Sequence, residues 1–137
     1  MNTSTTSKMR TSSKDFFRES VNNRFARHTP AVNIQETDQE YLLKLAAPGF
    51  QREEIAIEIK NNIISIGSLR KSFRPEHEVY RNSRYEYDFS VWERKFALPP
   101  DADAIMANAF YINGELLVHI PKDSRPQSVD FTRVMVY

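Results

Sequence analysis

The strongest constraint on the fold of this chain is an apolar residue at every second position, repeated in short runs after Pro30. In EEIAIEIK, residues 53–60, Ile55, Ile57 and Ile59 fall on one side of the run and Glu58 on the other. Successive side chains of a β-strand point to opposite faces, so this spacing predicts strands that bury one face. The same alternation occurs in segments 30–36, 40–46, 63–68, 88–98, 105–112 and 115–121.

Turn-forming residues separate these runs. Pro48-Gly49 ends the second run, Asn61-Asn62 joins the third to the fourth, and Pro99-Pro100 ends the fifth. Asn113-Gly114 joins the last two, and Asn-Gly between alternating runs predicts a hairpin because both residues readily take a positive φ. About seven short strands with no helix between them predict an all-β fold, an immunoglobulin-like antiparallel β-sandwich.

The residues that carry enzyme chemistry do not cluster in this sequence. Its three histidines, His28, His77 and His119, are far apart, and none has the spacing of a metal ligand. His119 alternates with apolar neighbours, so we expect its ring to face solvent. The three glycines leave no room for a phosphate loop, and no serine lies in a Gly-x-Ser-x-Gly elbow. We therefore expect no enzyme, no catalytic residue, no metal and no cofactor.

Charge and hydropathy argue against two classes of partner. The 19 basic and 18 acidic residues nearly cancel, which does not favour nucleic acid. No run approaches the ~20 apolar residues that span a bilayer, and MNTSTTSKMRTSSK lacks the apolar stretch of a secretory signal. The chain has no cysteine, which suits a reducing compartment. We expect a cytoplasmic protein with neither a nucleic acid nor a membrane as partner.

Residues 1–29 form an arm that differs from the rest of the chain. Residues 1–14 are rich in serine and threonine, and such low complexity predicts disorder. In DFFRESVNNRF, Phe16, Phe17, Val21 and Phe25 recur near one helical turn or its multiples, which predicts a short amphipathic helix. Two alternatives stay open: the helix packs on its own domain, or it is exposed as a sticky arm.

A mostly charged stretch, residues 69–88, lies between two predicted strands. A loop of this length without structure is uncommon in a compact domain and is usually functional. Within it, Tyr85 and Tyr87 alternate with Glu86, which is compatible with a strand. A strand on so long a loop can reach the sheet of another subunit.

Arg94 is an unexpected charge in an apolar row. In FSVWERKFALP it alternates in step with Trp92, Phe96 and Leu98, which form one face of the run. An arginine there either extends its head to water along a sheet edge or pairs with a carboxylate. For the second alternative, Glu86 is our candidate acid.

The last segment, DFTRVMVY, residues 130–137, is apolar and follows the polar segment KDSRPQS. Chain ends are usually polar and frayed, because nothing there offsets the lost backbone freedom. Val134 and Val136 depart from that rule. Either this last strand packs on its own domain, or it serves a neighbouring molecule.

Two motifs make the chain resemble the α-crystallin domain of small heat shock proteins, bacterial type. One is Ala-x-x-x-Asn-Gly-x-Leu, formed by Ala109, Asn113, Gly114 and Leu116. The other is Phe-x-Arg-x-Phe-x-Leu-Pro, met by the row around Arg94 with tryptophan in the first position. The resemblance covers residues 30–122. It implies an arm over residues 1–29, the α-crystallin domain over 30–122 and a C-terminal extension over 123–137.

The resemblance also implies a function. Members of this family act as ATP-independent holdases, chaperones that bind unfolding proteins and prevent their aggregation. The implied unit is a homodimer formed by strand exchange, with Arg94, Glu86, Tyr85 and Tyr87 at the interface. The alternative is a monomeric or dimeric co-chaperone or adaptor of similar fold that binds one folded partner.

Two further sets of residues take their roles from the resemblance. The family's Ile-x-Ile/Val motif is matched by Val134 and Val136, which would lie along a neighbour's sheet edge and link dimers into larger oligomers. Valine in place of isoleucine removes a methylene at each anchor, about 0.8 kcal/mol apiece, so the assembly is expected to be labile. Contacts with non-native client proteins are assigned to the apolar residues of the arm, Phe16, Phe17, Val21 and Phe25.

Overall fold

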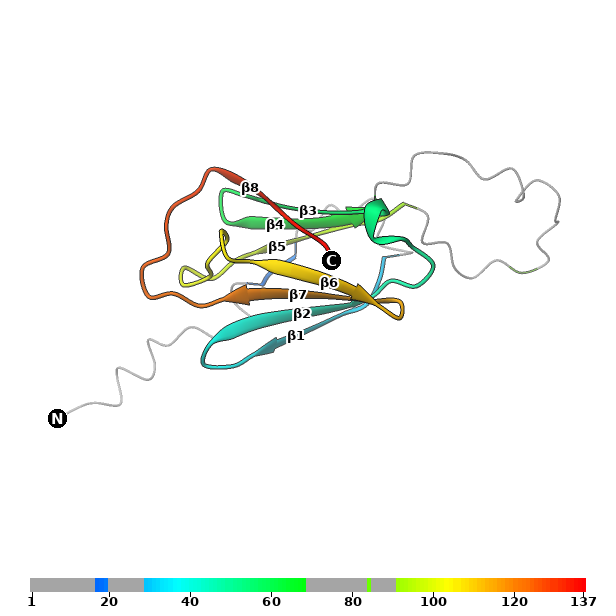
Figure 1. Cartoon of the computed structure of the whole chain (residues 1–137), viewed down its shortest axis with the longest axis horizontal. Helices are drawn as coiled ribbons and strands as arrows, with labels where there is room; N and C mark the ends of the chain where they lie inside the picture. Colours follow the sequence, from blue (N-terminus) through cyan, green and yellow to red (C-terminus); the bar gives the residue numbers. More distant parts are fainter. Residues whose placement is uncertain (1–16, 20–28, 69–83, 85–90) are drawn as a thin grey trace.

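The computed structural model describes residues 17–19, 29–68, 84 and 91–137. These residues form eight strands, which run through the body of the molecule in Figure 1. Their bounds are β1 (Val32–Glu36), β2 (Glu40–Ala46), β3 (Ile55–Lys60), β4 (Ile63–Ser68), β5 (Glu93–Ala97), β6 (Asn108–Ile112), β7 (Glu115–Pro121) and β8 (Phe131–Val134). A short 3₁₀ helix, Arg52–Glu54, precedes β3.

The strands form two sheets. One has the order β1-β2-β7-β6 and the other the order β5-β4-β3-β8. Every neighbouring pair in both sheets is antiparallel. The two sheets enclose one apolar core, to which strands of both contribute (Figure 1). The antiparallel β-sandwich predicted from the alternation is confirmed.

The core is built from the apolar side of each alternation. The side chains of β3 alternate between buried isoleucines and partly exposed residues, as the sequence of that strand predicts. Burying a side chain of this size contributes roughly 1.5–3 kcal/mol relative to leaving it exposed, so the inward rows stabilise the sandwich. The largest fully buried side chains are Trp92, Leu43, Leu45, Ile57, Ile64, Ile66, Leu116, Ile120, Val118 and Pro30.

The predicted hairpins form where the asparagines allow them. Asn61 and Asn62 take φ values of 52° and 62° between β3 and β4. Asn113 and Gly114 take 52° and 79° between β6 and β7. A Cβ at position 114 would also lie a tight 3.3 Å from the Cα of Pro48, so both φ and space favour glycine there.

The sixth strand begins later than the alternation predicts. The expected run was 105–112, whereas β6 starts at Asn108. The carboxylate oxygen Oδ1 of Asp103 accepts hydrogen bonds from the backbone N–H groups of Ile105 and Met106, at 3.1 and 3.3 Å. This side-chain cap holds the preceding residues in a turn, because it competes with sheet pairing for their donors.

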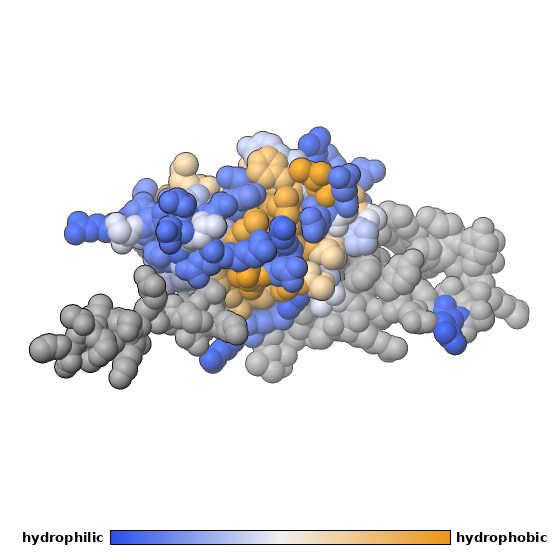
Figure 2. Space-filling view, turned by 90° about the horizontal axis from the view of Figure 1, so that it is seen from below, coloured by the Kyte–Doolittle hydropathy of each residue, from blue (hydrophilic) through white to orange (hydrophobic). Residues whose placement is uncertain are grey.

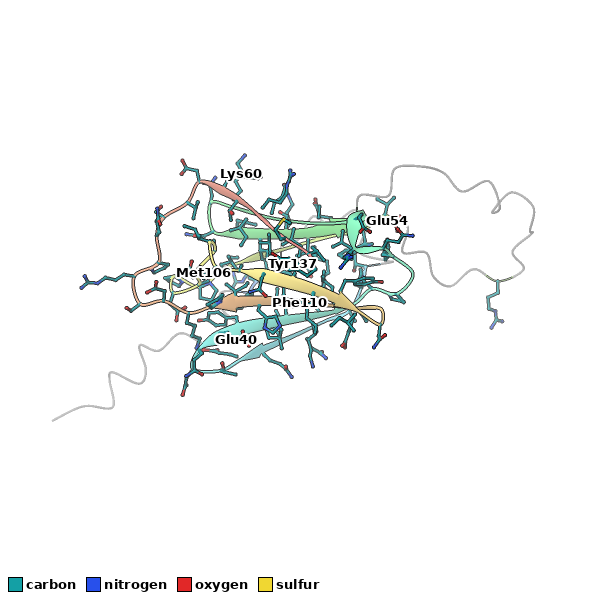
Figure 3. The ribbon with its side chains drawn as sticks, in the orientation of Figure 1. Glu40, Glu54, Lys60, Met106, Phe110 and Tyr137 are labelled. Atoms are coloured by element: carbon teal, nitrogen blue, oxygen red, sulfur yellow. The ribbon has the colours of Figure 1, made fainter. Side chains whose placement is uncertain are left out.

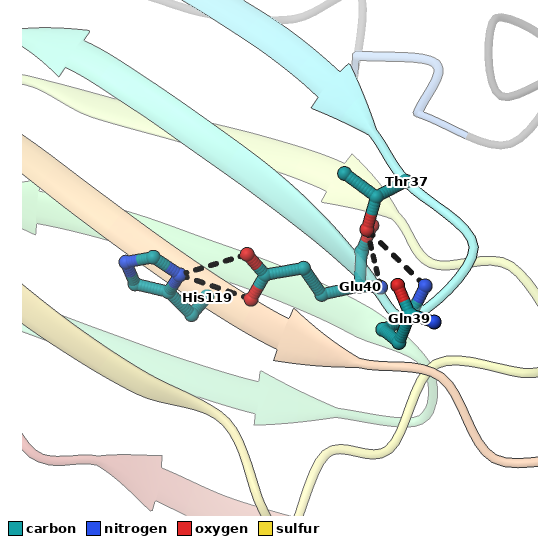
Figure 4. A network of polar contacts seen from close by, with 4 residues as sticks. All are labelled: Thr37, Gln39, Glu40 and His119. Atoms are coloured by element: carbon teal, nitrogen blue, oxygen red, sulfur yellow. Dashed lines mark hydrogen bonds and ion pairs between the residues drawn. The ribbon is translucent and has the colours of Figure 1, made fainter.

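His119 is not simply solvated, contrary to expectation. Its ring does lie on the face of β7 opposite the buried Val118 and Ile120, but it is only partly exposed. Nδ1 of His119 lies 3.0 Å from Oε1 of Glu40 on the neighbouring strand β2 (Figure 4). The edge of the ring also contacts Phe110, with centroids 5.9 Å apart. Cross-strand neighbours in the sheet therefore decide its environment, and its own strand's pattern does not show them.

Candidate interaction surfaces at the open sides of the sandwich

A sandwich of two sheets has two open sides, where the edges of the sheets lie next to each other and the core would meet solvent. On one side β5 lies near the segment just before β1, because Arg94 contacts the backbone carbonyl of Pro30. On the other side β3 lies near β6, and the last residues of the chain contact both strands. Each open side is covered by a segment from near one end of the chain.

We call residues 131–137 on β3 and β6 the C-terminal closure. Its first part, β8, pairs antiparallel with β3, so that Val134 lies opposite Ile57. The chain then crosses to the other sheet, where Val136 forms a parallel bridge with Ala109 of β6. Three backbone hydrogen bonds hold the crossing: Ala109 N–H to Met135 O at 3.1 Å, Tyr137 N–H to Ala109 O at 2.8 Å, and Tyr111 N–H to Tyr137 O at 2.9 Å.

The side chains of the closure alternate as the sequence predicts. Val134 is 4% exposed and Val136 packs against the core, while Met135 between them is 62% exposed. In this single chain both valines cover edges of its own two sheets, which is one of the two alternatives that the sequence left open. The physical reason is that the strand edges and the inward pockets they need are also present in the chain itself, within reach of the segment. That they also lie along a neighbour's sheet edge, as the resemblance implies, stays a prediction.

We call Phe17–Glu19, together with Arg94 of β5, the N-terminal clasp. The guanidinium of Arg94 donates from Nε and Nη2 to the two carboxylate oxygens of Glu19, at 2.6 and 2.5 Å. Its third nitrogen, Nη1, donates to the carbonyl of Pro30 at 2.9 Å. The side chains of Arg94 and Glu19 are only 16% and 29% exposed. Such a two-pronged, partly buried pair is stronger and more directional than a surface ion pair.

The acid that Arg94 needs is therefore supplied by the arm. The sequence named Glu86 as the candidate, and among the described residues the partner is Glu19 instead. Tyr85, Glu86 and Tyr87 lie outside the described residues. The alternative in which the arginine head reaches water along the sheet edge does not hold for this chain, because its three nitrogens are all engaged. The sequence offered one clue to this partner. Glu19 is one of only two acidic residues among the first thirty, which contain six basic residues.

Phe17 is the apolar part of the clasp. It is buried, and its ring meets the ring of Tyr41 edge to face, with centroids 5.3 Å apart. The hydroxyl of Tyr41 donates to Oδ1 of Asp101 at 2.6 Å. Burial, and then this hydrogen bond to a carboxylate, raise the pKa of the Tyr41 phenol well above its usual value. The phenol therefore stays neutral and packed beneath Phe17.

The backbone of the clasp pairs with β5 at Glu19. Glu19 forms an antiparallel bridge with Phe96, and the N–H of Ala97 donates to Arg18 O at 3.4 Å. Arg18 and Glu19 therefore continue the sheet beyond β5, and the predicted helix does not include residues 17–19. The sequence left two alternatives for the arm, packing on its own domain or exposure. Phe17 packs on its own domain. Phe16, Val21 and Phe25 lie outside the described residues.

The hairpin motif has a second role that sequence reasoning missed. Ala109 and Leu116 are fully buried, and Asn113 and Gly114 make the turn between them. Beyond this, the backbone of Ala109 both donates to and accepts from the C-terminal closure. A small residue in an inward row allows another chain segment to approach closely, and that was the available signal.

Apolar side chains remain exposed around the closure. Phe110 and Ile112 on the outer side of β6, with Met135 and Tyr137 of the closure, are all among the large exposed hydrophobic residues. Phe110 and Tyr137 lie side by side in Figure 3, with ring centroids 5.8 Å apart. A different face of the molecule, seen from below in Figure 2, also shows apolar residues between hydrophilic regions.

Other kinds of site are not found in the described part of the chain. Within residues 17–19, 29–68, 84 and 91–137 there is no group of three His, Cys, Asp or Glu side chains placed to hold a metal ion. No helix among the same residues is both long and apolar enough to cross a membrane.

Comparison with known proteins agrees with this geometry. The mitochondrial small heat shock protein hspI of Dictyostelium discoideum is 27% identical over 73% of this chain and 46% of its own length. Small heat shock protein C2 of Rickettsia felis is 30% identical, covering 79% of this chain and 73% of its own. The chain thus spans about half of one curated relative and about three quarters of the other.

Solved structures and family models give the same result. The crystal structure of a small heat-shock protein from Xylella fastidiosa superposes with a TM-score of 0.61 at 30% identity, covering 75% of this chain and 95% of that one. The model of the Hsp20/alpha crystallin family matches residues 33–136, which run from the second residue of β1 to Val136 of the closure. The chain therefore belongs to the Hsp20/alpha crystallin family.

Proposed function

We propose that this protein is an ATP-independent holdase, which binds unfolding proteins and keeps them from aggregating. Its family is that of the small heat shock proteins, which are not enzymes. The observation that carries the proposal is the exposed apolar surface formed by β6 and the C-terminal closure. Contiguous apolar surface on a soluble protein marks a site of interaction, and unfolding proteins present the complementary apolar segments.

The chemistry of this surface fits passive binding. Phe110 and Tyr137 offer rings, while Ile112 and Met135 offer flexible or branched aliphatic groups. Methionine and aromatic side chains adapt to partners of varied shape, which a chaperone of many clients requires. Burial of apolar area supplies the free energy, so no nucleotide has to be hydrolysed for capture.

The test is suppression of aggregation of a heat-labile protein without ATP, followed by light scattering. Ile112→Ser should weaken protection, because this side chain is 52% exposed within the proposed surface. Ile63→Ser is the matched control, since Ile63 is 38% exposed on the other sheet, at the start of β4. Equal protection by the two variants would place client binding outside the surface around β6.

We further propose that the working unit is a homodimer that assembles into larger oligomers. The strand around Tyr85 and Tyr87 would pair with the sheet of a second subunit, and Arg94 would exchange Glu19 for Glu86 of the partner subunit. Two features support this arrangement. β1 is an edge strand of its sheet and can pair with a strand of a second chain, and the planar fork of Arg94 can bind a carboxylate of that chain. The solved structure from Xylella fastidiosa is described as having a distinct high order structure, which is said of that protein.

The C-terminal closure is our candidate for the link between dimers. In the single chain, Val134 and Val136 cover the β3 and β6 edges of the same molecule. The same backbone bonds and pockets would serve equally when the segment comes from a neighbour. Each contact is weak, so an assembly held this way depends on many segments acting together from dimeric units.

The arm is the second candidate surface for clients. Phe16, Val21 and Phe25 keep the role that the resemblance assigned to them. Phe17 could take that role only after leaving its place on Tyr41, because it is buried there.

We place the proposed holdase activity in the cytoplasm. The chain contains no cysteine and so does not depend on an oxidising compartment.

A further inference from the structure

The N-terminal clasp has the three parts of a peptide-recognition site. Phe17 fills an apolar position against Tyr41, the backbone at Arg18 and Glu19 extends the sheet beyond β5, and the Glu19 carboxylate meets the fork of Arg94. Sheet extension supplies affinity in such sites, while pockets for particular side chains supply specificity. Here the specific positions are an aromatic residue and, two residues later, a carboxylate.

The receiving side of this site is held in place independently of Phe17–Glu19. The guanidinium of Arg94 lies over the ring of Phe96, with Cζ 5.2 Å from the ring centroid, and its Nη1 is fixed by Pro30 O. These two contacts orient the remaining two nitrogens toward the carboxylate. Tyr41 is similarly fixed, by its hydrogen bond to Asp101 and by the ammonium of Lys122, which lies 4.8 Å from its ring centroid. A preorganised receptor loses little entropy when it binds.

The segment that fills the site is held more lightly than the strands are. Its described contacts are one bridge to Phe96, one long backbone bond from Ala97, one ring contact and one ion pair. None of these contacts requires that the segment belong to the same chain.

We propose that the β5 side of the sandwich is a recognition site for extended segments of other polypeptides that carry an aromatic residue two positions before a carboxylate. Phe17–Glu19 is the internal occupant of this site. The segment is tethered to β1 through residues 20–28, and such a tether gives an effective concentration in the millimolar range. An external peptide at micromolar concentration therefore competes only when the internal occupant is disabled. This proposal stands apart from the holdase activity and from the surface around β6, and it concerns a subunit in which Arg94 pairs with its own Glu19 rather than with Glu86 of the partner subunit.

The test measures the binding of a labelled peptide to the full-length chain by fluorescence anisotropy. The probe is fluorescein-labelled Asp-Ser-Phe-Arg-Glu-Ser, which is residues 15–20 with Phe16→Ser, so that only one aromatic residue remains. Two proteins are compared with the parent: Glu19→Gln, and Phe17→Ala with Glu19→Ala. We expect both to bind the probe at least about tenfold more tightly than the parent does. The single variant keeps Phe17, so it preserves the test if the double variant does not fold.

The matched control is a peptide in which arginine and glutamate exchange places, Asp-Ser-Phe-Glu-Arg-Ser. Its composition and charge are unchanged, but the carboxylate now follows the aromatic residue directly. We expect its affinity for both variants to fall at least about tenfold, because the carboxylate alternates to the other face of the strand. Equal binding of the two peptides, or no binding of the probe to either variant, would overturn the proposal. No aggregating client is used, so the result does not depend on the proposed holdase function.

Discussion

The N-terminal clasp and the C-terminal closure do the same structural task by different physical means. Each covers one open side of the sandwich with a short segment from near one end of the chain. The clasp relies on one ion pair and one ring, Glu19 with Arg94 and Phe17 with Tyr41. The closure relies on a backbone ladder and two inward valines, and its last three residues add backbone bonds to β6.

This difference teaches where each side can fail. A site built on one directional ion pair is lost when a single side chain is removed, and it weakens with salt. A site built on backbone bonds and apolar contacts loses its strength gradually, because each contributes only about 1 kcal/mol.

The largest effect is expected from breaking the clasp at Arg94. Arg94→Gly should lower the free energy of unfolding by about 3 kcal/mol, because it leaves Glu19 partly buried without its partner. Arg94→Lys should cost less but should not be neutral, since it keeps the charge and loses the fork. Chemical denaturation measures both. If the glycine variant unfolds at the parent's midpoint, the clasp does not contribute to stability.

Breaking the closure should have the next largest effect. Val134→Ala with Val136→Ala should lower the free energy of unfolding by about 2 kcal/mol, because two inward side chains are truncated. We also expect dimers to persist while higher oligomers disappear, which native mass spectrometry across a dilution series would detect. Met135→Ala is the control, because that side chain is exposed. An unchanged oligomer distribution would show that the closure serves its own chain only.

Alkaline pH should sharpen the comparison through Tyr41, which lies beneath Phe17 of the clasp. Its pKa is raised in the folded chain, so above about pH 10 the unfolded chain ionises this phenol first. The stabilising contribution is complete below pH 10 and is lost as the pH rises toward the folded pKa. At pH 11 the parent should have lost about 1 kcal/mol more than Tyr41→Phe has. Parallel pH profiles of the two proteins would show that this phenol does not titrate differently on folding.

The smallest effect is expected from salt, which should separate the two sides without any mutation. Raising NaCl from about 0.05 M to about 1 M shortens the screening length to ~3 Å and weakens partly exposed ion pairs. Amide exchange of Ala97, whose N–H donates to Arg18 O, should then accelerate about threefold. Exchange of Tyr111, whose N–H donates to Tyr137 O, should stay the same. Equal responses of the two amides would remove the electrostatic distinction between the two sides.

Much of the fold could be predicted because its signals are local. Alternation along each run decides which side chains face inward, and the hairpins at Asn61-Asn62 and Asn113-Gly114 form where these residues allow a positive φ. The inward direction of Val134 and the outward direction of Met135 also follow from alternation alone. The late start of β6 was missed, because the cap from Asp103 competes with the apolar spacing of residues 105–107.

The candidate sites depend on contacts that no local pattern contains. The sequence left Arg94 either to reach solvent or to pair with an acid, and the acid it does pair with, Glu19, lies 75 residues away along the chain. The local pattern likewise could not predict that the closure pairs with β3, or that His119 lies against Glu40. Alternation reports only which face of a strand a residue occupies. Which strands become neighbours, and which distant segment covers an open edge, is decided when the two sheets pack and bring edges from opposite ends of the chain together.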